Sequence, residues 1–292
     1  MPTPQPGIFA LDARSHAHLE FDLIAPLDLG AVDGVFRGLD ERGAAHVVVG
    51  LAPSRVADCT AVDCTAVDFT AVDGVDGFTM PGTQHDLWVW VSGIASDEVF
   101  DRSRAVTQAL APFARMATEE TGYMYRDNRD MTGFIDGTAN PTVAEAPEVA
   151  IIQSGPGAGG SVVLYQKWVH DLDRFETLSV AEQEATIGRT KPDSIEFDDE
   201  RKPKTAHISR VVIEADGEEL EIFRRGTPFG TVREHGLLFV AFSADQARLG
   251  RMLRRMAGAE DGVRDGLTHY STPVTGSYYF VPPVEAIRPQ GA

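Results

Sequence analysis

The order of apolar patterns along the first 128 residues constrains the fold most strongly. Runs of β-branched and aromatic residues predict strands, and apolar residues spaced three and four apart predict helices. One helical face covers residues 32–39, and a longer helix begins near Ser96. The apolar face of that longer helix carries Val106, Leu110 and Phe113. The predicted strands are residues 18–24, 46–51 and 86–91.

The second part of the chain repeats this order. A capping box formed by Ser179 and Glu182 predicts the start of a short helix. Another helix follows a cap at Ser243, and a turn signal at Asp216 and Gly217 separates two strands. The predicted strands are residues 160–169, 208–213, 220–223, 237–242 and 277–281.

Short antiparallel strands with helices on one face indicate an α+β fold. Because the order of elements occurs twice, we predict two ferredoxin-like βαββαβ units in tandem. The first unit covers residues 1–128 and the second covers residues 129–292.

One segment fits neither a strand nor a helix. The sequence Thr-Ala-Val-Asp occurs three times at five-residue spacing between Cys59 and Asp73. Three copies are too few to stack into a solenoid, so we predict a surface insertion loop over residues 57–78. Both cysteines, Cys59 and Cys64, lie in this loop. The chain therefore has neither a disulfide framework nor a four-cysteine metal site.

The charge balance excludes several classes of partner. The chain carries 26 Lys and Arg against 44 Asp and Glu, a net charge of -18. Such a chain repels a phosphate backbone, so nucleic acid and anionic membrane surfaces are not expected partners. No apolar run reaches the roughly 18 residues that span a bilayer, and the first residues do not resemble a secretory signal. We expect a cytoplasmic location, which the few cysteines fit.

Two further patterns carry little functional information. The glycine-rich residues 155–160 precede a strand, and they lack the Lys and the following helix of a phosphate-binding loop. The eight histidines include no pair at the i, i+4 spacing of a helical zinc site, so His207 alone would indicate little.

Residues 133–141 form a motif of a different kind, Gly-Phe-Ile-Asp-Gly-Thr-Ala-Asn-Pro. Asp136 lies between glycines, which allow a close approach of the backbone to a flat or bulky ligand. An Asx-turn that ends a segment would give the same pattern, and the motif alone leaves both readings open.

The segment GFIDG resembles the GxxDG motif of the dye-decolourising peroxidases, a haem family. Other parts of the chain resemble landmarks of this family in the same order, and the pattern is most similar to the shorter bacterial members called type B. These parts are Thr83–Trp88, Val169–Leu172, Glu182–Glu184, Ile187–Lys191, His207, Arg224–Gly230 and Thr275–Ser277. The family has two ferredoxin-like domains, with the haem pocket in the C-terminal one.

The resemblance implies roles for particular residues. His207 would be the proximal ligand of the iron of haem b. Asp136 would move the proton of peroxide, and Arg224 would stabilise the developing charge. Arg225 is the competing residue, but strand alternation sends it to the opposite face from Arg224. The remaining residues implied to contact the haem are Arg189 and His170 at a propionate, with Gly137 and Thr138.

The chain departs from the family pattern at two positions. Relatives commonly have a proximal Asp where His269 stands here, so Asp265 would have to replace that Asp or the electron donation to the iron would weaken. Many type B relatives have Asn or Ser where Gly226 stands, and a Gly offers no side chain to peroxide.

The implied activity is reduction of hydrogen peroxide through an oxyferryl intermediate, with dyes, phenols or other small electron donors and a preference for acidic pH. Large donors would need a surface Trp or Tyr, for which Trp168, Tyr165, Tyr278 and Tyr279 are available. A non-enzymatic haem-handling protein is the main alternative. A partner-binding module without haem and a chlorite-decomposing enzyme are less favoured. Family habit implies a homo-oligomer.

Overall fold

The computed structural model describes residues 2–28, 45–60, 62–215 and 217–287. Its centre is a ten-stranded antiparallel sheet with the strand order β10-β12-β11-β6-β1-β5-β2-β14-β7-β13. An additional pairing between β12 and β7 closes the sheet into a barrel-like shape. The strands are β1 (Ser15–Leu23), β2 (His46–Leu51), β5 (Leu87–Gly93), β6 (Ala114–Tyr123), β7 (Ser161–His170), β10 (Phe223–Arg224), β11 (Thr227–Gly230), β12 (His235–Ser243), β13 (Ser271–Pro273) and β14 (Ser277–Val281).

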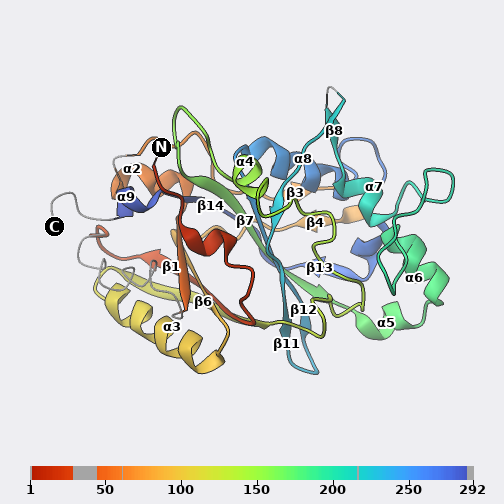
Figure 1. Ribbon diagram of the computed structural model, residues 1–292, viewed down its shortest axis with the longest axis horizontal. Coiled ribbons are helices and arrows are strands. Elements are labelled where there is room, and N and C mark those ends of the chain that lie inside the picture. Colours follow the sequence, from red (N-terminus) through yellow and green to blue (C-terminus); the bar gives the residue numbers. More distant parts are fainter. Residues whose placement is uncertain (1, 29–44, 61, 216, 288–292) are drawn as a thin grey trace.

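Helices lie on two sides of this sheet (Figure 1). Helix α3 packs against β1 and β5, and α8 packs against β12 and β7. The α-helices are α2 (Val56–Cys59), α3 (Ser96–Leu110), α4 (Ala146–Ala150), α5 (Leu172–Glu176), α6 (Val180–Ile187), α7 (His207–Val211), α8 (Gln246–Met256) and α9 (Val284–Ile287). The short 3-10 helices are η1 (Pro6–Phe9), η3 (Pro53–Arg55), η4 (Val75–Gly77) and η5 (Gly266–His269).

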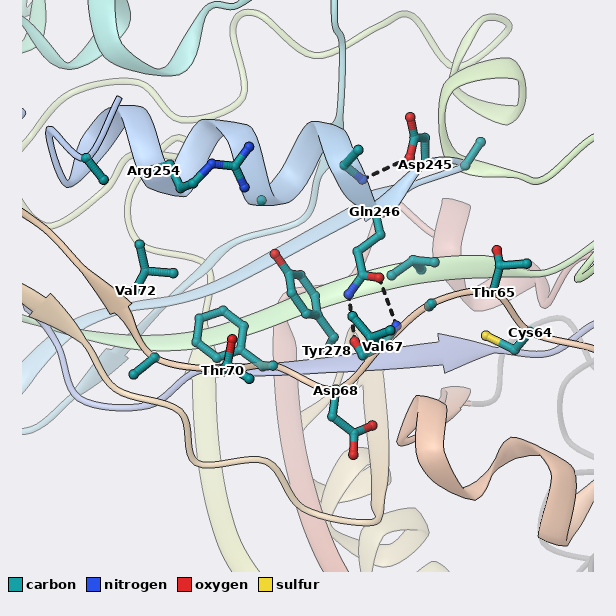
Figure 2. A pocket seen from close by; sticks show the side chains of 18 of the residues that line it. Cys64, Thr65, Val67, Asp68, Thr70, Val72, Asp245, Gln246, Arg254 and Tyr278 are labelled. Carbon is teal, nitrogen blue, oxygen red and sulfur yellow. Dashed lines mark hydrogen bonds between the residues drawn. The ribbon is translucent and has the colours of Figure 1, made fainter. Parts of the chain in front are cut away.

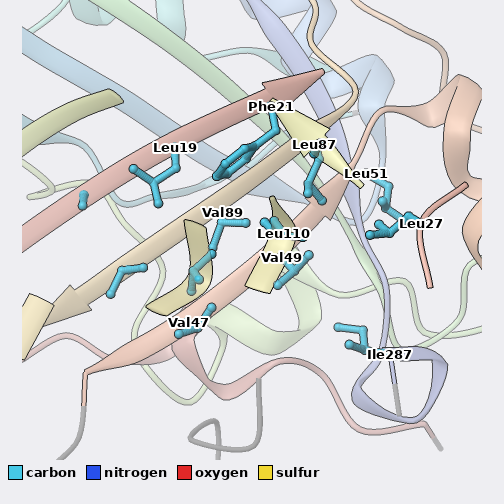
Figure 3. Close-up of a cluster of buried hydrophobic side chains, with 14 of the residues drawn as sticks. Leu19, Phe21, Leu27, Val47, Val49, Leu51, Leu87, Val89, Leu110 and Ile287 are labelled. Carbon is cyan, nitrogen blue, oxygen red and sulfur yellow. The ribbon is translucent and has the colours of Figure 1, made fainter. Parts of the chain in front are cut away.

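The buried apolar side chains form three clusters. Two lie outside the closed sheet, each against a helix, and one lies inside the barrel. The first cluster lies between α3 and the strands β1, β2 and β5, with Leu19, Val49 and Leu110 among its members (Figure 3). The second fills the barrel and contains Trp88 and Trp90. Both faces of β5 are therefore buried, which explains its continuous apolar sequence. The third lies between β7, β12 and α8.

Most of the predicted elements are confirmed. Helix α3 begins at Ser96, and the capping box of Ser179 and Glu182 opens α6. Gly217 has a positive φ of 83° between two short strands, as the turn signal predicts. These strands are β8 (Glu214–Ala215) and β9 (Glu218–Glu219). The predicted helix at residues 32–39 lies outside the described residues. The mixed α+β class with a closed antiparallel sheet is established, and the predicted division at residue 128 is not tested, although β6 pairs with β11 across it.

Four local predictions are wrong. Helix α3 ends at Leu110, so Phe113 lies beyond it, in the turn before β6. The structure has helix α7 where residues 208–213 predict a strand, because contact with α8 outweighs the β propensity of this apolar run: Arg210 is buried and donates to the Arg255 carbonyl at 2.9 Å. The strand predicted at residues 220–223 is only β10 (Phe223–Arg224). The N-cap of α8 is Asp245 rather than Ser243, whose hydroxyl instead accepts from the Asp245 amide.

Residues 62–71 of the Thr-Ala-Val-Asp segment form neither helix nor strand, and most of their side chains are half-buried or exposed, as expected for an insertion at the surface. Its third copy begins with Phe69, which is 5% exposed and packs in the third cluster. A two-stranded sheet of β3 (Val72–Asp73) and β4 (Thr79–Met80) follows. The insertion therefore covers part of the core. Residues 155–160 form a loop, as the sequence predicts.

Candidate active site

A large cavity lies between the sheet and the helices α7 and α8. It encloses about 1000 Å³ of empty space, including the part that is open to solvent. Phe239 of β12 and Trp168 of β7 line one wall, and Met252 and Met256 of α8 line another. A second, more polar cavity adjoins it and shares Asp136, His207 and Arg224 with it, among other residues. The structure thus brings the three principal predicted residues together around one space.

His207 is the first residue of α7 and is oriented by a buried carboxylate. Its Nδ1 donates to Oδ2 of Asp265 at 2.7 Å, and Asp265 is fully buried. The other oxygen of Asp265 accepts from the Leu267 amide at 2.9 Å and so caps η5. Because a carboxylate only accepts, the ring proton belongs on Nδ1, and Nε2 keeps a lone pair for a metal.

This contact decides between the two possibilities that the sequence leaves open. Asp265, and not residue 269, is the carboxylate partner of His207. His269 is four residues further on, at the end of η5, where its carbonyl accepts from Arg174. Burial lowers the pKa of His269, with the nearby positive charge of Arg264 adding to the effect.

Asp136 is positioned by the loop that carries the GFIDG motif. Its amide donates to the carbonyl of Asn128, and its Oδ1 accepts from the Gly137 amide at 2.7 Å. Gly137 has a φ of 74°, a conformation that glycine adopts without steric cost. Burial raises the pKa of Asp136 above its usual range, and the charge of Arg224 opposes this effect without cancelling it. Arg224 thus favours the ionised form of this carboxyl without outweighing the effect of burial.

Arg224 lies on β10 and is held by the Asn of the same motif. Its amide donates to Oδ1 of Asn140 at 2.9 Å, and Nδ2 of Asn140 donates to the Arg224 carbonyl at 2.8 Å. Burial lowers the pKa of Arg224. Arg225 points the other way, into the barrel, where it donates to the carbonyls of Ile8 and Ala10. The predicted alternation of the two arginines is confirmed.

Gly226 leaves an open space beside Asp136. A Cβ atom placed on this glycine would lie 3.5 Å from Oδ2 of Asp136 and 3.4 Å from Leu237. These are ordinary van der Waals contacts, so a side chain would fit. Gly226 thus offers no polar side chain in the immediate neighbourhood of Asp136.

Arg189 and the motif residues line the second cavity, as do Gly137 and Thr138. Arg189 donates to the Thr138 hydroxyl at 3.2 Å and forms an ion pair with Glu196 at 2.9 Å. This polar edge offers guanidinium and hydroxyl donors to a carboxylate.

The predicted propionate contact of His170 is not supported, because both of its ring nitrogens already have partners. Nδ1 is hydrogen-bonded to Ser271 at 2.8 Å, and Nε2 is hydrogen-bonded to Asp130 at 3.1 Å. The charge of His170 and hydrogen bonds from Thr132 lower the pKa of Asp130, although burial of that carboxyl acts in the opposite direction. The sequence analysis misses Asp130 and Ser271, although Asp130 lies six residues before Asp136 in the same loop.

Gln166 is a further residue that the sequence analysis misses. It is fully buried, it lines the large cavity, and its Nε2 is without a hydrogen-bond partner among the described residues. Its Oε1 accepts from the indole of Trp168 at 3.2 Å. The alternation of β7 places Gln166, Trp168 and His170 on one face. This alternation could have identified Gln166 from the sequence.

The site fits a haem on the evidence of its donor set. An imidazole with a lone pair on Nε2 and a buried carboxylate behind it is a suitable iron ligand. The large cavity is lined mainly by apolar side chains, and the adjoining polar edge suits propionates. A carboxylate and a guanidinium in the same cavity supply an acid–base group and a fixed positive charge. Such a set of groups is typical of haem proteins that activate peroxide.

Comparison with known proteins assigns the family. The model of the family described as "Dyp-type peroxidase, C-terminal" matches residues 127–286. A dye-decolorizing peroxidase of Mycolicibacterium paratuberculosis is 39% identical over 213 residues, which are 71% of this chain and 60% of the relative. The chain therefore spans about three fifths of the length of this curated relative. The chain belongs to the Dyp-type peroxidase family.

Solved structures agree over nearly the whole chain. DyPB from Rhodococcus jostii is 30% identical with a TM-score of 0.89, and the match covers 99% of both chains. A variant of the Rhodococcus jostii protein in complex with heme is 31% identical with a TM-score of 0.87, and it covers 96% of this chain and 97% of that one.

The described ranges contain neither a metal-binding cluster of side chains nor a membrane-spanning helix. Among residues 2–28, 45–60, 62–215 and 217–287, no group of three or more His, Cys, Asp and Glu side chains could hold a metal ion. The helices of these ranges also include none that is long and apolar enough to cross a bilayer.

Proposed function

We propose that the protein is a haem peroxidase that reduces hydrogen peroxide while it oxidises dyes, phenols or other small electron donors. The observation that carries this proposal is the placement of His207, Asp136 and Arg224 around one cavity. Each comes from a different segment of the chain. Together they supply a metal ligand, an acid–base group and a fixed positive charge, which peroxide activation requires.

In this proposal Nε2 of His207 holds the iron of haem b, and Arg189 with Thr138 contacts a propionate. The bound haem would supply the iron atom that binds peroxide and the electrons for cleavage of its O–O bond. Asp265 holds the His207 ring in position and raises its electron donation through the 2.7 Å hydrogen bond.

Asp136 acts as the proton carrier. Its ionised carboxylate would take a proton from one peroxide oxygen and return it to the other oxygen, which would leave as water. Arg224 places a fixed positive charge beside the negative charge that develops during this cleavage. Because burial raises the pKa of Asp136, the fraction of ionised carboxylate increases with pH over a range higher than for an exposed Asp. The proposed preference for acidic pH would then come from later steps with the donor.

Further parts of the proposal rest on the family. They are the ferredoxin-like duplication of the fold, a homo-oligomer and a cytoplasmic location. The negative net charge supports an exclusion of nucleic acid as a partner.

Haem handling without peroxidase activity is the second candidate, and Gly226 is the observation that favours it. A glycine beside Asp136 offers no side chain to peroxide. The lack of a carboxylate partner for His207 would also favour haem handling. Asp265 contacts His207 and is such a partner, so this argument no longer applies.

The test is stopped-flow spectroscopy of the haem-reconstituted protein with Asp136→Ala and Arg224→Ala. We expect each to slow the peroxide-dependent change of the Soret band by about 100-fold or more. The matched controls are the exposed residues Glu119→Ala and Arg115→Ala, which should react at the wild-type rate. If both active-site variants also react at the wild-type rate, the assignment is wrong. If even the wild type binds haem without reacting, haem handling is favoured.

A further inference from the structure

A separate cavity, the surface cavity, lies on the other side of α8 from the proposed haem cavity. Figure 2 shows the residues that line it. Helix α8 separates the two, because Met252 and Met256 line the haem cavity whereas Gln246, Gly250 and Arg254 line the surface cavity. The opposite wall of the surface cavity is the Thr-Ala-Val-Asp insertion. The segment that fits no regular period in the sequence thus forms one wall of a cavity that is open to solvent.

The insertion is fixed in place and does not lie loosely over the helix. The side-chain amide of Gln246 accepts from the Val67 amide at 2.9 Å and donates to the Val67 carbonyl at 2.7 Å. Both bonds are drawn in Figure 2. The Phe69 amide donates to Oε1 of Gln84 at 3.0 Å. The cavity wall is therefore built by specific contacts.

Tyr278 carries an unpartnered hydroxyl at this cavity. Its side chain extends from β14 toward α8 (Figure 2), and the residue is only 7% exposed. Its ring packs on Phe69 at a centroid distance of 5.0 Å. In the described part of the chain, no hydrogen bond engages the Tyr278 Oη atom. Burial raises the pKa of Tyr278, so the hydroxyl stays protonated and can both donate and accept.

Gly250 creates the space in front of this hydroxyl. A Cβ atom placed there would lie 3.7 Å from Oη of Tyr278 and 3.3 Å from Nη1 of Arg254. Glycine is disfavoured inside a helix, so its presence at this point of α8 indicates a need for room. Arg254 is held through Nε by Glu260 at 3.3 Å. The phenol and the guanidinium therefore flank the same small volume.

We propose that this surface cavity binds a neutral phenol, with its ring between the insertion and α8 and its hydroxyl between Tyr278 and Arg254. The proposal rests on the proposed function, because it assigns a place to the electron donor of the peroxidase. Arg254 only donates, so the ligand atom must be an acceptor, and a phenol oxygen is one. The residues that line the cavity include Asp68, Asp73 and Asp245, so the local negative charge disfavours a ligand with its own carboxylate.

The position of the site suits an electron donor. Tyr278 packs in the same apolar cluster as Trp168, Met252 and Met256, and these three line the haem cavity. Of the four aromatic residues considered from the sequence, Tyr165 and Tyr279 are buried in the barrel core, and Trp168 lines the haem cavity. Tyr278 alone among these four lines the surface cavity.

The test is calorimetric titration of the full chain with 2-methoxyphenol in the absence of peroxide, both as purified and after haem reconstitution. Tyr278→Phe and Arg254→Gln should each weaken binding about three- to tenfold, the effect of one lost hydrogen bond. Gly250→Leu should abolish binding, because its side chain fills the space, and circular dichroism checks that this variant is folded. Arg251→Gln is the matched control. Arg251 also lies on α8 and pairs with Glu260, but it does not line the cavity.

Equal affinity in the wild type, Tyr278→Phe, Arg254→Gln and Arg251→Gln would overturn the proposal, as would no binding by the wild type. Because the titration needs no peroxide, its result is independent of the peroxidase activity. Binding that the variants weaken, together with a haem protein that does not react with peroxide, would support the site and contradict the proposed function.

Discussion

Nδ1 of His207 lies 2.7 Å from Oδ2 of Asp265, across 58 positions of sequence. The carboxylate is fully buried, and its second oxygen caps η5, so it is fixed from two sides. In the proposed function it would direct Nε2 of His207 and raise its electron donation, and it would compensate for a histidine at position 269, where the family resemblance implies an Asp.

Replacement of Asp265 by Asn tests this compensation. Asn keeps an oxygen for the Leu267 amide but removes the negative charge behind His207. We expect the peroxide reaction of the haem-reconstituted protein to slow about 10- to 100-fold, as is typical for partners of metal ligands. Stopped-flow absorption measures the rate. His269→Gln is the control and should leave the rate unchanged, since Asp265 is the carboxylate that contacts His207; an equal loss in both variants would contradict the role of Asp265.

Asp136→Asn should stabilise the haem-free protein in a pH-dependent way. Burial raises the pKa of Asp136, so the folded state holds a proton that the unfolded state releases. Folding stability is therefore lost as pH rises from the usual Asp range through the raised pKa, and Asn avoids this loss. We expect the melting temperature of the variant to exceed that of the wild type near pH 7 and to equal it below about pH 3. A difference that does not change with pH would show that the carboxyl is not perturbed by burial.

Gly226→Ser should restore a polar group beside Asp136. The distances of 3.4 Å to Leu237 and 3.5 Å to Asp136 leave room for a Cβ atom, so we expect the stability to change by no more than about 0.5 kcal/mol. A hydroxyl that donates to the ionised carboxylate lowers its pKa. The peroxide step should then reach its plateau at a lower pH, which a stopped-flow pH profile measures. Gly226→Ala adds the methyl group alone and should keep the wild-type profile.

Asp130→Asn should destabilise the protein, because Asp130, whose side chain is 16% exposed, pairs with the buried His170 at 3.1 Å. Removal of one partner of such a pair costs about 3 kcal/mol. The pKa of Asp130 is lowered, so its contribution is fully present above the usual Asp range and is lost as pH falls below about 4. Denaturant unfolding at pH 6 and pH 3 measures this, and the loss should be smaller at pH 3. Asp127→Asn is an exposed control in the same loop; an equal loss there would refute the account.

Features that depend on residues close together in the sequence could be predicted, whereas features that depend on contacts between distant segments could not. Asp136 and Arg224 could be predicted because each lies in a short contiguous motif, and the alternation of β10 excludes Arg225. Asp130 and Ser271 escaped because their link to His170 spans three segments of the chain. Helix α7 was predicted as a strand for a related reason, since its burial against α8 overrides the local preference of an apolar run. The irregular insertion could be recognised as a loop, but its role as a cavity wall depends on the Gln246 side chain, which is 179 positions away.

The most direct test of the central claim is the absorption spectrum of the haem-reconstituted protein before and after one equivalent of hydrogen peroxide at acidic pH, with His207→Ala alongside. The account predicts one haem per wild-type chain, a ferric Soret band that changes within seconds of peroxide addition, and loss of that spectrum in His207→Ala. A wild-type spectrum that peroxide leaves unchanged, or an identical spectrum in His207→Ala, would contradict it.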